Sequence, residues 1–306
     1  MKTVLIAVIL MVSSYTAYAQ SCCCTGAGSN YSILPNLNKH IIGLRYTHRN
    51  YYSQTSSINP DLNGRITDQY MNSLEIFGRF NVYDRLQLSV FLPVNIISQQ
   101  AADKNSSAAG LGDISLLLQY NVLNPMLCTG KTTKHQLRLG LGTKLPSGDF
   151  KMDANDLFST NLQLGTGSVD FLANAIYTLR YKSFGFNTTA SYKLNTPNNR
   201  GYRFGDRAQA GLSFFYIFEV KDIQLMPTAG LNFEHQFENK MKGRLLDYTG
   251  GDFVNTSVGI DIYYKQFAFS SSVSPAVVNR LNWPGENRNR LNIEAGIFYN
   301  FSTSKK

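Results

Sequence analysis

Apolar and polar residues alternate along most of the chain, in segments of about ten to fourteen residues bounded by Gly, Pro, Asn and other polar residues. In the last segment, Leu291, Ile293 and Ile297 share one face, whereas Asn292 and Glu294 share the other. A period of two is the signature of a β-strand with one apolar and one polar face. These segments are about twice as long as the usual strand of a soluble protein and match strands that cross a bilayer. The pattern therefore predicts an all-β transmembrane protein.

The connections between these segments alternate between tight turns, such as Tyr83-Asp84-Arg85, and long polar loops, such as 147–167. Outer-membrane barrels have this asymmetry, with short periplasmic turns and longer extracellular loops, and an even strand number places both termini in the periplasm. We therefore expect an antiparallel up-and-down β-barrel over 40–301. A secreted β-sandwich is the alternative, but it predicts shorter strands. The expected strands, about twelve in number, are 40–51, 69–83, 85–98, 111–123, 135–146, 168–181, 184–195, 206–219, 223–236, 252–264, 266–278 and 290–301.

The N-terminus has the layout of a secretory signal peptide, with the charged Lys2, the apolar run 4–12 and Ala17-Tyr18-Ala19 before Gln20. We expect residues 1–19 to be a signal peptide and 20–39 a periplasmic leader that contains cysteines. The apolar run is too short for a membrane anchor, and the residues before Cys22 fit a lipoprotein signal poorly. No apolar run downstream is long enough to cross a bilayer as a helix. Export and a barrel together predict the outer membrane of a Gram-negative bacterium.

Composition supports this interpretation. The chain is 16% charged and 12% aromatic and contains 24 glycines, which suits strands that face lipid. The formal net charge of +9 is carried by basic residues scattered singly along the chain, so we expect no nucleic-acid partner. The expected partners are outer-membrane lipid and lipopolysaccharide, whose anionic groups a basic barrel would face.

The end of the chain resembles the β-signal that the barrel-assembly machinery reads, because Gly296 is followed by Phe298 and then by Tyr299 and Phe301. This resemblance implies that the segment 296–301 contacts the assembly machinery. Residues 302–306 extend beyond it as a short tail, which we expect in the periplasm.

Three glycine-containing motifs lie at expected strand ends: 110–113 (GLGD), 145–149 (LPSGD) and 165–170 (GTGSVD). Together they resemble a family of outer-membrane barrels assigned to transport in the phenol meta-degradation pathway, over roughly residues 70–301. The cysteine-rich start, 21–24, is similar to a Bacteroidota-type variant of such proteins. The resemblance implies an outer-membrane channel or transporter for small solutes, including hydrophobic or aromatic compounds. From the residues themselves, the glycines indicate tight turns or bulges rather than catalysis.

Charged residues of both signs fall on the polar face of the expected strands. They either pair into a structural network that fills the barrel or line an aqueous path and set its selectivity. Barrel diameter grows with strand number, so about twelve strands predict a narrow or partly plugged channel for small solutes. The candidate lumen-lining residues are Arg45, Arg49, Glu75, Arg79, Asp113, Arg138, Lys144, Asp170, Arg180, Lys193, Arg207, Glu234, Asp261 and Glu294.

All four cysteines fall on the periplasmic side of the expected topology. In an oxidising compartment the simplest outcome is a disulfide between Cys128 and the N-terminal cluster. A soft-metal site for copper(I) or zinc is the alternative, although its spacing matches no recognised ligand motif. The candidate metal ligands are Cys22, Cys23, Cys24, Cys128, His40 and His135.

An outer-membrane lipid hydrolase is a further class to weigh, because such an enzyme needs a His base on the outer surface near the extracellular edge. Alternation places His48 and His235 there, but no Ser is tied to either by a motif. No Walker loop, dinucleotide fingerprint or nucleophile elbow is present in the sequence. We therefore expect no enzymatic activity and no cofactor, and retain a structural barrel without conductance as the main alternative to a channel.

Overall fold

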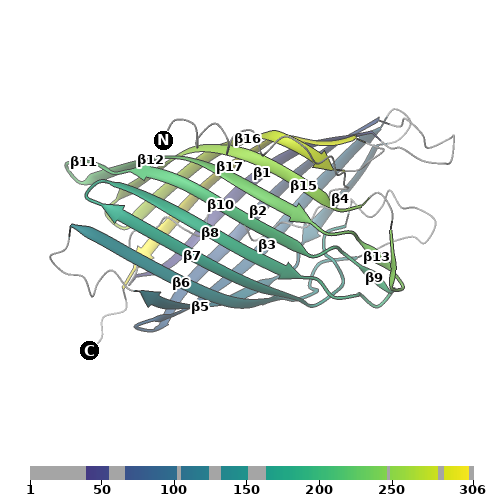
Figure 1. Ribbon diagram of the computed structural model, residues 1–306, viewed down its shortest axis with the longest axis horizontal. Helices are drawn as coiled ribbons and strands as arrows, with labels where there is room; N and C mark the ends of the chain where they lie inside the picture. Colours follow the sequence, from purple (N-terminus) through teal and green to yellow (C-terminus); the bar gives the residue numbers. More distant parts are fainter. Residues whose placement is uncertain are drawn as a thin grey trace, which may run out of the picture.

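The computed structural model describes residues 39–54, 66–101, 105–123, 132–150, 163–246, 249–281 and 286–302. Within these ranges, twelve long strands form one closed antiparallel β-barrel (Figure 1). This confirms the predicted fold class. The long strands are β1 (His40–Gln54), β2 (Ile66–Tyr83), β3 (Leu86–Ala101), β5 (Ser115–Leu123), β6 (Thr133–Lys144), β7 (Asp170–Tyr181), β8 (Phe184–Leu194), β10 (Arg207–Tyr216), β12 (Ile223–Gln236), β15 (Gly251–Tyr264), β16 (Phe267–Leu281) and β17 (Glu286–Phe301).

The barrel closes where the first and last strands pair, so the purple β1 and the yellow β17 lie side by side in Figure 1. His40 lies opposite Phe301, and Gln54 lies opposite Glu286. Every other long strand pairs with its nearest long neighbour along the chain. Closure pairs every strand on both sides and so removes the exposed edges that an open sheet would present. In the part of the chain that the structure describes, no helix is long and apolar enough to cross a membrane.

The two ends of the barrel differ, and we name them the turn end and the loop end. At the turn end, tight turns join β2 to β3, β7 to β8 and β15 to β16. Three of the tight turns hold a lysine in the left-handed conformation. These are Lys182 between β7 and β8, Lys221 between β11 (Phe218–Val220) and β12, and Lys265 between β15 and β16, with φ of 52°, 53° and 53°. His40 and Phe301 also lie at the turn end. The loop end carries the longer connections and a small sheet of short strands (Figure 1).

The pleat separates the side chains into two sets along each strand. Outward residues such as Ile76 and Leu141 are 47% and 72% exposed, whereas inward residues such as Arg79 and Arg138 are 2% and 1% exposed. The outward set is largely aliphatic and aromatic. An apolar outer wall around a polar interior is the pattern of strands that face lipid.

Strand pairing continues beyond the expected boundaries at the loop end. The expected loop 99–110 contains β4 (Asn105–Leu111), which pairs with β3, and the expected loops 196–205 and 237–251 contain the two-residue strands β9, β13 and β14. The alternation pattern missed these elements because both faces are polar or small there, as in Ser106-Ser107-Ala108-Ala109. The expected strand 206–219 is divided at Ile217. The short strands are β9 (Tyr202–Arg203), β11 (Phe218–Val220), β13 (Lys240–Met241) and β14 (Arg244–Leu245).

Candidate functional site: the barrel lumen

Most of the charged residues expected in the lumen lie at inward positions within the barrel wall, whereas Asp113 and Arg180 lie at its ends. Asp113 lies in the short break between β4 and β5, from which its carboxylate reaches Lys144. Arg180 lies at the rim of the turn end, where its Nε donates to the carbonyl of Lys182 at 2.6 Å. The inward set comprises Arg45, Arg49, Glu75, Arg79, Arg138, Lys144, Asp170, Lys193, Arg207, Glu234, Asp261 and Glu294.

At the loop end, two buried carboxylates share one lysine. Lys144 Nζ lies 2.5 Å from Asp113 Oδ2 and 2.8 Å from Asp170 Oδ2. Lys193 Nζ lies 3.6 Å from the same oxygen of Asp170, which is fully buried. Thr166 donates to Asp113 from both its backbone nitrogen and its hydroxyl, at 2.8 and 2.9 Å. We call these residues, Asp113, Lys144, Thr166, Asp170 and Lys193, the loop-end network.

The loop-end network joins the three glycine motifs of the sequence. A Cβ on Gly148 would lie 2.9 Å from Gly165 Cα and 3.0 Å from Gly112 C, so the three backbones touch where each motif has a glycine. Gly148 N also donates to Asp113 Oδ1 at 3.1 Å. A side chain at any of these contacts would push the backbones apart, which is the physical reason for glycine there. The motifs are thus parts of one structural junction at the mouth of the barrel.

Further charges pair along the inner wall of the barrel. Arg45 forms an ion pair with Glu75, which lies opposite it on the neighbouring strand. Arg207 Nη1 lies 3.4 Å from Glu234 Oε1, and the other carboxylate oxygen accepts a hydrogen bond from Gln209 at 2.6 Å. Cross-strand pairing of opposite charges, which the sequence predicted, therefore occurs for much of the inward set.

Towards the turn end, the lumen wall changes from polar to apolar. The rings of Phe77 and Phe91 are tilted towards each other with centroids 5.2 Å apart. Phe298 meets Phe77 edge-on, with the ring centroids 6.1 Å apart. Alternation alone predicted a polar face here, although Phe77 and Met71 share the parity of Glu75 and Arg79 on β2. We call the contacting buried residues the apolar belt: Ile41, Phe77, Phe91, Leu117, Phe215, Ile217, Met226, Tyr263, Ala268 and Phe298.

Phe298 of the belt depends on a glycine beside it. A Cβ on Gly296 would lie 2.7 Å from two atoms of the Phe298 ring, so the ring folds back over this glycine. Gly296 lies opposite Arg45 on β1. The glycine and aromatic residues of the C-terminal motif therefore have a packing role inside the barrel.

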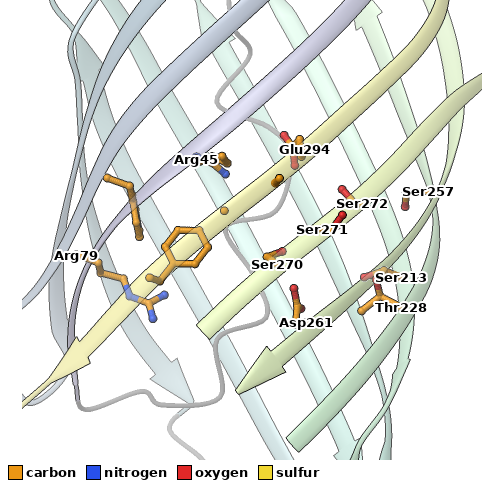
Figure 2. Close-up of a pocket in the computed structure, with 14 residues that line it drawn as sticks. Arg45, Arg79, Ser213, Thr228, Ser257, Asp261, Ser270, Ser271, Ser272 and Glu294 are labelled. Carbon is orange, nitrogen blue, oxygen red and sulfur yellow. The ribbon is translucent and has the colours of Figure 1, made fainter. Parts of the chain in front are cut away.

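A cavity of about 80 Å³ lies in the lumen between the charged pairs and the apolar belt. Figure 2 shows Arg79 on one side of this space and Asp261 on the other, with Ser270 beside Asp261. Ser270 donates to the Asp261 carboxylate. The cavity walls combine cations, carboxylates, hydroxyls and aromatic rings. Its lining residues are Arg45, Phe77, Arg79, Ser213, Thr228, Ser257, Asp261, Ser270, Ser271, Ser272, Glu294, Ala295, Gly296 and Phe298.

Of the candidate metal ligands, only the two histidines lie among the described residues. His40 Nδ1 accepts a hydrogen bond from Asn81 N at 3.3 Å, and its ring stacks on Phe301. His135 Nδ1 lies 2.7 Å from Tyr177 Oη. No group of three or more His, Cys, Asp or Glu side chains suited to a metal ion occurs within the described ranges. The four cysteines, the signal peptide and most of the leader lie outside those ranges.

The two outward histidines each have a polar partner. His235 Nδ1 lies 2.7 Å from Asp252 Oδ1 on the next strand, and the imidazole meets Phe237 edge-on. His48 Nδ1 lies 2.8 Å from Asn72 Oδ1. A hydrolase would also need a nucleophile within reach of the imidazole.

Comparison with known proteins addresses the fold. No protein-family model matches the chain, and no curated protein matches it in sequence. The COG4313 outer membrane channel from Pseudomonas putida F1 matches in structure with a TM-score of 0.67 and 15% identity, over 89% of this chain and 98% of that one. The β-domain of the Bordetella autotransporter BrkA matches with a TM-score of 0.52 and 12% identity, over 86% and 100%. The chain has the fold of an outer-membrane β-barrel.

Proposed function

We propose that the protein is an outer-membrane channel for small solutes, with its turn end and both termini in the periplasm. The observation that carries this proposal is the contrast between the two walls of the closed barrel: the outer wall is apolar, and the inner wall carries paired charges around a cavity. A lipid-facing wall fixes the barrel in a membrane, and a charged lumen offers polar solutes a route that lipid does not. Similarity to a protein described as an outer membrane channel supports the same conclusion.

The lumen would select solutes at two levels. At the loop end, the loop-end network holds three backbone segments together and pairs the charges of Asp113, Lys144 and Asp170 with one another. At the turn end, the apolar belt narrows the path with rings such as Phe77 and Phe298. Apolar constrictions exclude water and hydrated ions unless side chains move. A channel built in this way would pass small molecules and conduct salt weakly.

We propose that the solutes include small hydrophobic or aromatic compounds. This narrower claim rests on the resemblance of the three glycine motifs to the barrels assigned to the phenol meta-degradation pathway, and on the aromatic character of the belt. Aromatic rings in a pocket favour aromatic solutes through stacking and edge-on contacts.

The surroundings of the barrel complete the proposal. Membrane lipid and lipopolysaccharide would contact its outer wall, and the segment 296–301 would be read by the barrel-assembly machinery before β17 pairs with β1. The cysteine-containing leader would lie in the periplasm, either bridged to Cys128 or bound to a soft metal. Loss of bound metal on changing Cys22, Cys23 and Cys24 to Ser would favour the metal site.

Conductance of the purified protein in planar bilayers tests the channel, and liposome swelling with a panel of phenols, sugars and amino acids tests its solutes. We expect small single-channel currents and faster swelling with small solutes than with large ones. Heat-unfolded protein at the same concentration is the control. No current and no swelling with any solute would refute the channel and leave a structural barrel.

A further inference from the structure

Two buried arginines in the lumen lack an anionic partner. Arg79 on β2 and Arg138 on β6 are 2% and 1% exposed. Nε and Nη2 of Arg79, and Nε and Nη1 of Arg138, have no hydrogen-bond partner among the described residues. Every other inward arginine whose contacts are described above has a carboxylate close by. Arg45 and Arg207, in contrast, pair with Glu75 and Glu234.

The carboxylates nearest to Arg79 along the wall are already engaged. Glu75 pairs with Arg45, and Asp261 accepts a hydrogen bond from Ser270 on its own side of the cavity (Figure 2). No ion pair joins Arg79 or Arg138 to a carboxylate within the described residues. The two guanidinium groups also repel each other. Asp261 and Glu294 line the same cavity as Arg79, but within the described residues neither forms an ion pair with Arg79 or Arg138.

Such an arrangement is costly unless an anion completes it. Removing one charge from water without a partner is unfavourable, and the cost is larger for two like charges. The apolar belt beside Arg79, with Phe77 two residues away on β2, lowers the local dielectric and strengthens any interaction with an ion of opposite sign. A bound anion near both arginines would therefore offset the cost of burying their charges and stabilise the folded barrel.

We propose that Arg79 and Arg138 form a binding site for a small oxyanion inside the barrel. A guanidinium offers paired N–H donors that match the two oxygens of a carboxylate or of an inorganic phosphate or sulfate. Arg79 lines the cavity of about 80 Å³, where Ser270 and Ser213 supply further hydroxyls. This space accommodates an ion of about that size or a few water molecules. The aromatic side of the same cavity, formed by Phe77 and Phe298, would hold the ring of an aromatic carboxylate.

This inference deepens the proposed channel function, on which its role in transport rests, by naming anionic solutes as those the lumen favours. Anion binding does not require conduction, so the anion site and the channel function can be refuted independently. An ion held at Arg79 and Arg138 would lie on the turn-end side of Phe77 and Leu117, at the level of the belt residue Ile41. There it would compete with the passage of other anions.

The test measures the melting temperature of the detergent-solubilised full-length barrel at constant ionic strength. Chloride is replaced stepwise by acetate, benzoate, phosphate or sulfate, so the separate arms distinguish carboxylates from inorganic oxyanions. A ligand that binds only the folded state raises the melting temperature as its concentration exceeds its dissociation constant. We expect at least one oxyanion to raise it, and R79Q with R138Q to weaken that ion's apparent affinity about ten-fold or more.

Two variants keep the result interpretable. R180Q makes the same substitution at the rim, outside the lumen site, and should leave the anion effect unchanged. R79K keeps the charge but removes the paired donors, so it should fold and bind the oxyanion more weakly than the natural protein. The double glutamine variant should also melt at a higher temperature than the natural protein in chloride, because it buries no unpaired charge.

An oxyanion effect that is absent, or that persists unchanged in the double variant, would overturn the site. Conductance measured on the same preparation separates this failure from failure of the channel. Currents without an anion effect would reject the site alone, whereas an anion effect without currents would reject the channel alone.

Discussion

Asp170 offers a direct measure of how strongly the loop-end network holds the barrel together. Its carboxylate is fully buried, lies 2.8 and 3.6 Å from the ammonium groups of Lys144 and Lys193, and accepts hydrogen bonds from Ser168 Oγ and Thr196 N. The change Asp170→Asn keeps the shape and an acceptor for both hydrogen bonds but removes the charge. It leaves Lys193 without this partner, whereas Lys144 keeps Asp113.

Breaking a buried ion pair by removing one partner costs about 3–5 kcal/mol. The amide of the Asp170→Asn variant retains the hydrogen bonds, and Lys144 retains one carboxylate. We therefore expect a loss at the lower end of this range, about 3 kcal/mol of the free energy of unfolding. Asp252→Asn is the matched control, since Asp252 faces outward and its pair with His235 is partly exposed, with relative side-chain accessibilities of 32% and 37%. Exposed pairs contribute about 0–1 kcal/mol.

Urea unfolding of the protein in phospholipid vesicles, followed by heat-modifiability on gels, gives both free energies. Unchanged urea dependence would confirm that the variants unfold between the same states. A cost of Asp170→Asn below about 1 kcal/mol, or no larger than that of Asp252→Asn, would refute the idea that the loop-end network stabilises the barrel.

Four other predictions follow from the same structure. Phe298→Ser should raise single-channel conductance several-fold, because it removes a ring from the apolar belt, whereas Ile297→Ser on the outer wall should leave conductance unchanged. Equal conductance in the two variants would exclude the belt as the constriction. Gly165→Ala should sharply reduce the fraction of folded protein on gels, because the new Cβ would lie 2.7 Å from Gly148 O. Full folding of this variant would show that the junction of the three glycine motifs tolerates a side chain. Lys182→Gly should stabilise the barrel by about 1 kcal/mol in urea, because the lysine has a φ of 52°, and a loss of stability would contradict this. The protein and its His235→Ala variant should both leave phospholipid and lipopolysaccharide intact, and hydrolysis by the natural protein alone would indicate an enzyme.

The arginine pair shows where sequence reasoning stopped. Parity along each strand placed Arg79 and Arg138 on the polar face, together with residues of both signs. Parity does not say which residues are neighbours across strands, so it could not separate the paired Arg45 from the unpaired Arg79. That difference arises because Glu75 lies opposite Arg45 in the register, whereas Ile41 lies opposite Arg79. Register depends on how the whole barrel closes, which no local pattern encodes.

The loop end shows a second limit of the sequence. Alternation marks a strand only where one face meets lipid over several residues, so β4, whose faces are polar or small, and the two-residue strands β9, β13 and β14 gave no signal. The three glycine motifs were visible one by one, but their meeting around Asp113 depends on folding of the segments between them. By itself the sequence determined the all-β class, the strand number and the inward and outward faces, because the pleat repeats locally every two residues. Only the tertiary structure decided which charges pair, which remain alone and where the lumen becomes apolar, because these depend on contacts between residues far apart in the chain.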